Sequence, residues 1–206
     1  MNKAGIRTQL LGLLNRNDCT DAQANIFIEQ ALARIQRTLR VPAMEAEESI
    51  TTNDTNGDTI ILPNDFLNIK YLYSTTAEGT VMMEYRDVAT FMAIPSATGQ
   101  PRFYTRIRGE LKMKPYPQVG TNVQMIYYNE IPDLVNDTDS NFLTVIAPDL
   151  LVYGALTFAA DYFVDDRKPI FEERFGAIYN EVEEQSRLVE MDQTTLAIAP
   201  AYYYPY

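Results

Sequence analysis

The chain has 206 residues, and its 28 aspartates and glutamates outnumber its 17 lysines and arginines, giving a formal net charge of −11. It has no histidine and a single cysteine, Cys19, which excludes Cys/His zinc sites, Ser-His-Asp or Cys-His nucleophiles and intrachain disulfides. A chain this acidic has no excess of cations with which to wrap DNA phosphates.

Apolar residues make up 46% of the chain, which is typical of a globular protein with a sizeable core. The longest apolar run, residues 150–164, is interrupted by Thr157 and Asp161 and is shorter than the roughly 20 residues of a membrane span. Residues 1–5 lack the apolar stretch of a signal peptide. A glycine-rich phosphate loop is also missing, so we expect no nucleotide cofactor. From the short apolar run and the lack of histidine we expect no membrane segment and no metal.

Two helices are predicted near the N-terminus, over residues 4–14 and 20–39. Thr20 and Gln23 have the spacing of a capping box at the start of the second helix, and Pro42 ends it. The apolar residues of this helix recur at helical spacing, on one face: Ala24, Ile28, Ala31, Leu32, Ile35 and Leu39.

The pattern then changes to alternation of period two, which predicts strands. The expected strands are residues 59–62, 69–75, 80–85, 103–107, 110–114 and 122–128. A short helix is expected at residues 86–92. Arg108-Gly109 between two alternating runs indicates a hairpin.

The polar segment at residues 53–58 has two interpretations. Its carboxylates resemble a calcium loop, but the acidic alternation is incomplete, and the twelfth position counted from Asp54 is Asp65 instead of glutamate. Asn56-Gly57 is the commonest two-residue hairpin turn, and it lies between residues 50–52 and 59–62. We therefore interpret the segment as a hairpin.

Helix returns near the C-terminus. Residues 149–164 are almost entirely apolar, and residues 168–191 form an acidic amphipathic helix. The expected fold is α+β: a helical bundle of two N-terminal and two C-terminal helices, with an inserted antiparallel β-sheet subdomain and an extended C-terminal tail. The expected boundaries are 1–48 for the N-terminal helices, 49–146 for the β-rich subdomain, 147–191 for the C-terminal helices and 192–206 for the tail.

The tail ends in Tyr202, Tyr203, Tyr204, Pro205 and Tyr206. Tyrosine buries a large ring while keeping a polar group in contact with water, so it is enriched where proteins meet. These five residues are candidate contacts with a partner protein or a neighbouring subunit. The alternative is a tail that folds back on its own domain.

Charged residues form three further groups of interest. Asp161, Asp165 and Asp166 could supply a pair of carboxylates for acid–base chemistry, or they are ordinary helix caps. The last helix carries an acidic face, with Glu173, Glu181 and Glu184, which suits a channel, a subunit interface or plain solvation. The expected sheet carries one basic cluster, made of Arg102, Arg106, Arg108, Lys112 and Lys114. Its first four members are a candidate basic interface face, and the alternative is an ordinary exposed strand face.

Several short segments, in this order, resemble the head–tail adaptor (connector) proteins of short-tailed bacteriophages. They are Leu62-Pro63-Asn64-Asp65-Phe66, Pro101-Arg102-Phe103-Tyr104, Leu111-Lys112-Met113-Lys114-Pro115-Tyr116-Pro117 and Tyr127-Tyr128, followed by the apolar and acidic helices. The resemblance covers residues 1–192. It implies a structural virion protein, made in the cytoplasm of the host bacterium and located at the head–tail interface.

The resemblance further implies a dodecameric ring under the portal protein. Such a ring extends the DNA channel without binding DNA specifically and gives a platform to tail nozzle or fibre proteins. The C-terminal segments would reach the portal, and no catalytic residues are implied.

A second hypothesis is a β-sheet binding module for a glycan or protein partner. Tyr71, Tyr73, Tyr85 and Tyr104 would form its stacking surface, although aromatic residues in strands suit core packing equally well.

Overall fold

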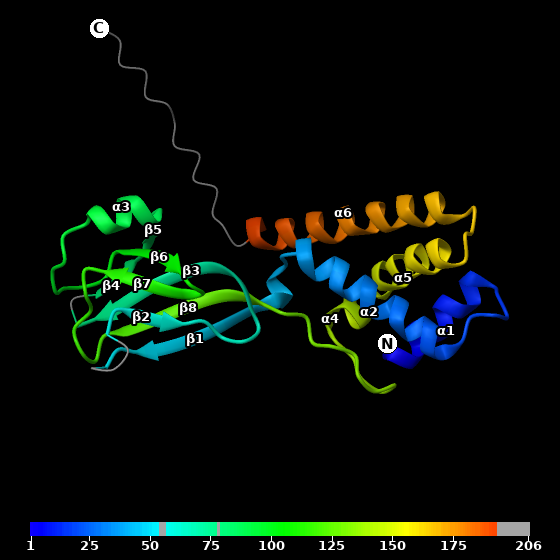
Figure 1. Cartoon of the computed structure of the whole chain (residues 1–206), viewed down its shortest axis with the longest axis horizontal. Coiled ribbons are helices and arrows are strands. Elements are labelled where there is room, and N and C mark those ends of the chain that lie inside the picture. Colours follow the sequence, from blue (N-terminus) through cyan, green and yellow to red (C-terminus); the bar gives the residue numbers. More distant parts are fainter. Residues whose placement is uncertain (54–56, 78, 193–206) are drawn as a thin grey trace, which may run out of the picture. The chain divides into compact units, whose positions relative to one another are not determined.

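The computed structural model describes residues 1–53, 57–77 and 79–192, which divide between two compact units. Among the described residues, 1–43 and 131–192 form a helical unit, and 44–130 form a unit that contains the described strands (Figure 1). The fold is therefore mixed α+β, as predicted, with strands segregated from the long helices.

The helical unit is organised around α5 (Pro148–Tyr162), which packs against α1 (Lys3–Leu14), α2 (Asp21–Thr38) and α6 (Lys168–Asp192). The short helix α4 (Phe142–Ile146) precedes it. Most side chains of α5 are buried because neighbouring helices cover it on several sides, which explains why it is apolar almost all round. The capping box predicted at Thr20 is present, with the Gln23 amide N–H donating to Thr20 Oγ1 at 3.3 Å.

The second unit contains two four-stranded sheets. The first has the order β1-β8-β3-β4 and the second the order β2-β7-β6-β5. Their bounds are β1 (Glu45–Thr51), β2 (Thr59–Ile61), β3 (Phe66–Thr76), β4 (Gly79–Met82), β5 (Glu84–Tyr85), β6 (Phe103–Ile107), β7 (Glu110–Lys114) and β8 (Asn122–Asn129).

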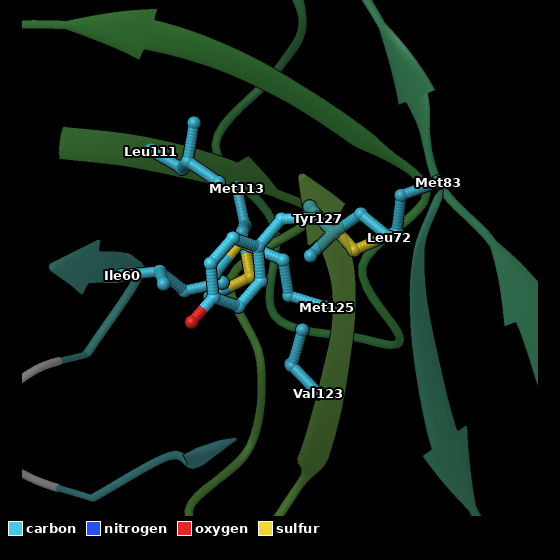
Figure 2. Packing of buried hydrophobic residues seen from close by; sticks show 8 residues of the cluster. All are labelled: Ile60, Leu72, Met83, Leu111, Met113, Val123, Met125 and Tyr127. Atoms are coloured by element: carbon cyan, nitrogen blue, oxygen red, sulfur yellow. The ribbon is translucent and has the colours of Figure 1, made fainter. Parts of the chain in front are cut away.

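Side chains from both sheets meet in one apolar core (Figure 2). On β8 the alternate residues Val123, Met125 and Tyr127 point into this core, as the period of two requires. The remaining members of the cluster are Ile60, Leu72, Met83, Leu111 and Met113. The shared core explains why neither sheet needs an apolar pattern on both of its faces.

The predicted hairpin at Arg108-Gly109 is confirmed. Arg108 has φ +53° and Gly109 has φ +80°, and β6 pairs antiparallel with β7 around them. Positive φ at both central residues is the requirement of the tight turn that matches strand twist.

The predicted hairpin at Asn56-Gly57 is wrong. Strand β1, which alternation did not reveal, pairs with β8, whereas β2 pairs with β7, so the two strands lie in different sheets. The sheets are also not wholly antiparallel, because β5 pairs parallel with β6. The short helix α3 (Val88–Ala93) forms two residues later than expected, after an N-cap at Asp87 whose side chain accepts the Thr90 amide.

Candidate interaction surfaces

The turn between α5 and α6 is fastened by Asp165 and Arg167. The Arg167 amide donates to Asp165 Oδ1 at 2.9 Å, and its Nη2 donates to Asp165 Oδ2 at 2.6 Å. The same guanidinium donates to the carbonyl oxygens of Leu13 and Leu14 at the end of α1. These hydrogen bonds from Arg167 lower the pKa of Asp165 to about 2.

This arrangement gives Asp165 a structural role. A carboxylate held ionised by a fixed guanidinium has no proton to exchange near neutral pH, so it is unsuited to acid–base catalysis. Asp161 pairs with Lys168 across the same turn. Asp166 is exposed beside it. Both α1 and the start of α6 are therefore anchored to one turn.

The inner side of α6 packs against α5 and α2. Phe171 and Phe175 are buried on its inner side. Arg34 from α2 donates to Glu172, with Nη1 to Oε2 at 3.0 Å, and its guanidinium lies 4.2 Å from the centroid of the Phe175 ring. The hydrogen bond from Arg34 lowers the pKa of Glu172. The inner side of α6 is thus occupied, and its outer side is turned to solvent.

The outer side of α6 carries both charged and apolar residues. At 100° per residue one stripe runs through Ile170, Glu173, Ala177, Glu181, Glu184 and Leu188. Glu184 Oε1 accepts a hydrogen bond from Arg187 Nη2 at 2.7 Å. Glu173 and Glu181 have no ionic partner in the described part of the chain. Ile170 and Leu188 are 51% and 56% exposed. We call this stripe the outer face of α6.

The predicted basic face is divided by the sheet. The register pairs Arg106 with Leu111 and Thr105 with Lys112, so Arg106 and Lys112 point to opposite sides. Arg106 lies over the Phe66 ring at 5.4 Å, and Arg102 is exposed ahead of β6. The two-residue turn at Arg108-Gly109 already fixes this register, so the division could have been inferred from the sequence.

A groove lies on the Lys112 side of the second sheet, against α3. It has a volume of about 640 Å³. Its lining combines aromatic, apolar and charged side chains: Asp58, Phe91, Met92, Ser96, Ile107, Arg108, Glu110, Lys112, Lys114 and Tyr116. We call it the α3–β7 groove. Lys114, which the sequence placed in the basic cluster, lies on the same side of the sheet as Lys112 and lines this groove.

The four tyrosines proposed for glycan stacking do not share one strand. Tyr71 and Tyr73 lie on β3 in the first sheet, and Tyr85 and Tyr104 lie on β5 and β6 in the second. The last two rings contact each other edge to face at 5.7 Å, so part of their surface is used in packing. Tyr202, Tyr203, Tyr204, Pro205 and Tyr206 lie outside the described residues.

Within residues 1–53, 57–77 and 79–192, no three cysteine, aspartate or glutamate side chains are grouped to hold a metal ion. None of the helices in these ranges is long and apolar enough to cross a bilayer.

Comparison with known proteins places the chain in a family. A search of curated proteins found no match. A family model described as "SU10 adaptor protein" matches residues 1–200, which is nearly the whole chain. The chain therefore belongs to the SU10 adaptor protein family, whose members are head–tail adaptors of phages and act as structural proteins, not as enzymes.

Proposed function

We propose that this protein forms a ring that joins the portal to the tail and extends the DNA channel of the virion. The observation that carries this proposal is the match of the adaptor family over residues 1–200, which includes the helical unit, the sheet unit and most of the C-terminal segment. A dodecameric ring follows from the resemblance of the sequence to connector proteins. The ring would lie at the head–tail interface and would carry the tail nozzle or fibre proteins on its far side.

The charge of the chain supports a channel through which DNA slides. Each copy has a formal charge of −11, so a ring has no cation excess to hold phosphates. The acidic residues of α6, Glu173, Glu181 and Glu184, would lie at the channel or at a subunit interface. At the channel, their electrostatic repulsion would lower the residence of DNA on the wall.

The C-terminal segment is the candidate contact with the portal. Residues 193–206 carry no Asp, Glu, Lys or Arg side chain and end in Tyr202, Tyr203, Tyr204, Pro205 and Tyr206. Their 14 residues span at most about 50 Å when fully extended. That length is enough to reach beyond a neighbouring subunit, and the tyrosines supply the aromatic anchors common in interface cores.

The proposal is tested by mass photometry of the protein mixed with the portal protein of its own phage. Three forms are compared: the full chain, a chain lacking residues 195–206, and a chain with serine at Tyr202, Tyr203, Tyr204 and Tyr206. The full chain should add a dodecamer to the portal, and both altered chains should lose it. The serine variant separates loss of the tyrosines from loss of chain length.

The outcomes separate the adaptor role from the docking of the C-terminal segment on the portal. A ring that forms on the portal without the C-terminal segment would keep the adaptor role and assign the segment to the tail side. A full chain that adds nothing to the portal would overturn the proposed ring and its docking.

A further inference from the structure

We propose that the outer face of α6 in one copy docks into the α3–β7 groove of the neighbouring copy, and that this contact closes the ring. This inference rests on the proposed ring, and the two surfaces are those through which neighbouring subunits of the ring would contact each other. The occupant is α6 of a second copy of this chain. Its acidic, amphipathic face would bind a groove that is basic and aromatic.

The groove has positive charge that the described part of the chain does not neutralise. Its two carboxylates, Asp58 and Glu110, both lie near Lys112, at 3.8 and 3.9 Å from Nζ. Arg108 and Lys114 have no carboxylate within 4.0 Å among the described residues. Arg108 is exposed at the groove's rim, so it is available to an anionic partner.

Lys114 gives the strongest evidence that the groove binds an anionic group. Its side chain lines the groove while the residue is only 6% exposed, and its Nζ donates to the Ile94 carbonyl at 2.7 Å. The ammonium also lies 5.2 Å from the centroid of the Phe91 ring. A buried ammonium is costly unless a negative group compensates it, and one carbonyl acceptor serves only one of its three N–H donors. A carboxylate entering the groove would supply the missing charge.

The outer face of α6 matches this groove in chemistry. It presents Glu173 and Glu181 without ionic partners in the described part of the chain, and exposed Ile170 and Leu188 beside them. The groove offers the cations Arg108 and Lys114, and apolar surface from Met92, which is 59% exposed. Glu173 and Glu184 are about 16 Å apart along the helix, so the stripe offers carboxylates over three turns.

The contact is heterologous because the two surfaces are different patches of one chain. Head-to-tail contacts of this kind generate rings when the rotation closes, whereas a patch that meets itself gives only a dimer. DNA is the less suitable anion, because each copy carries a charge of −11 and would repel it away from the groove.

The test uses two full-length charge-reversal variants. Glu173→Lys with Glu181→Lys makes the helix face basic, and Met92→Glu with Arg108→Glu makes the groove acidic. All four side chains are exposed and none forms an ion pair in the described part of the chain, so the fold should survive, which circular dichroism checks. The concentration needed for half of the chains to enter rings is measured by mass photometry. Each variant alone should need about tenfold more protein or worse, because like charges then face each other.

An equal mixture of the two variants should assemble as the wild type does. In an alternating ring the basic helix of one variant meets the acidic groove of the other, and the acidic helix of the second meets the unaltered groove of the first. A contact within one chain cannot be rescued by mixing. The matched control for the helix variant, Asp133→Lys with Asp166→Lys, also replaces two exposed carboxylates by lysines, outside both surfaces, and should assemble normally.

Lys114→Met tests the buried cation itself. The apolar stem keeps its packing, so the variant should stay folded but assemble more weakly than the wild type. Variants that assemble as well as the wild type, or a mixture that stays monomeric, would overturn the interface and leave the proposed ring standing. A wild-type chain that forms no ring, alone or on the portal, would overturn both.

Discussion

Gly154 lies where three helices of the bundle meet, and its substitution gives a sharp test of that packing. A Cβ at this position would be 3.1 Å from Cβ of Ala31 on α2 and 3.1 Å from Cε2 of Phe175 on α6. Both distances are shorter than ordinary van der Waals contact. We predict that Gly154→Ala lowers the free energy of unfolding, although alanine is the better helix former.

The sign follows from two opposing magnitudes. Replacing glycine by alanine inside a helix contributes about 1 kcal/mol. Overpacking a core costs about 1–3 kcal/mol. The Ala31 Cβ is fixed to its backbone and cannot rotate away, and the Phe175 ring is held by the Arg34 guanidinium at 4.2 Å. With neither neighbour free to move, the steric cost should exceed the gain by about 1 kcal/mol.

Gly176→Ala is the matched control. It lies on α6, and a Cβ there would meet nothing within 4 Å, so it should raise stability by up to about 1 kcal/mol. The assay is urea unfolding followed by far-UV circular dichroism, which reports mainly the helical unit. Equal stabilisation by the two substitutions would refute the claim that contacts at Gly154 set the spacing of α2, α5 and α6.

Three further predictions concern the same unit. Asp165→Asn should lower the free energy of unfolding at neutral pH. Because the folded-state pKa of about 2 lies below the ordinary 3.8, the difference from wild type is complete above pH 3.8 and disappears as the pH falls towards 2. Urea unfolding across this pH range measures it. Thr20→Ala should cost about 1 kcal/mol by removing the capping box, with Thr20→Ser as the control that keeps it. Glu172→Gln should cost less than about 1 kcal/mol, since the paired side chains of Arg34 and Glu172 are 30% and 45% exposed, and high salt should reduce the difference; a larger loss that persists in salt would contradict a solvent-screened pair.

Local patterns predicted the helices and one hairpin well. The Thr20 capping box and the apolar stripe of α2 are decided within a few residues of one another, so the sequence alone gives both. The same holds for β6 and β7, whose turn at Arg108-Gly109 sets their register. These are the elements for which local preference and tertiary structure agree.

The pairing of β1 could not be inferred in this way. Its partner is β8, with Glu45 opposite Tyr128 and Thr51 opposite Asn122, so the contacts lie far apart in the chain. The strand is rich in glutamate and lacks a clean alternation, because it lies at the edge of its sheet and is only half-buried. Asn56-Gly57 indicated a local hairpin, and the shared core between the two sheets overrode it.

The grouping of charges was misjudged although the Arg108-Gly109 turn sets the register, because proximity in the sequence does not mean proximity in a sheet. Arg106 and Lys112 read as one basic patch, yet the strand period puts them on opposite sides. Lys114, from the same predicted cluster, is the buried cation of the α3–β7 groove. Sheet register therefore matters more than composition for locating such a surface.

A charged interface also suits the order in which a ring must form. If copies met through large apolar patches, those patches would be exposed on each free chain and would favour indiscriminate association. An acidic helix and a basic groove can both stay hydrated until a neighbour is placed correctly, and like charges reject wrong registers. The contact should then weaken as salt rises, because exposed charges are screened over about 10 Å at 0.1 M salt. A ring whose assembly ignored salt would need a different contact, with apolar surface instead of Glu173, Glu181 and Arg108 at its centre.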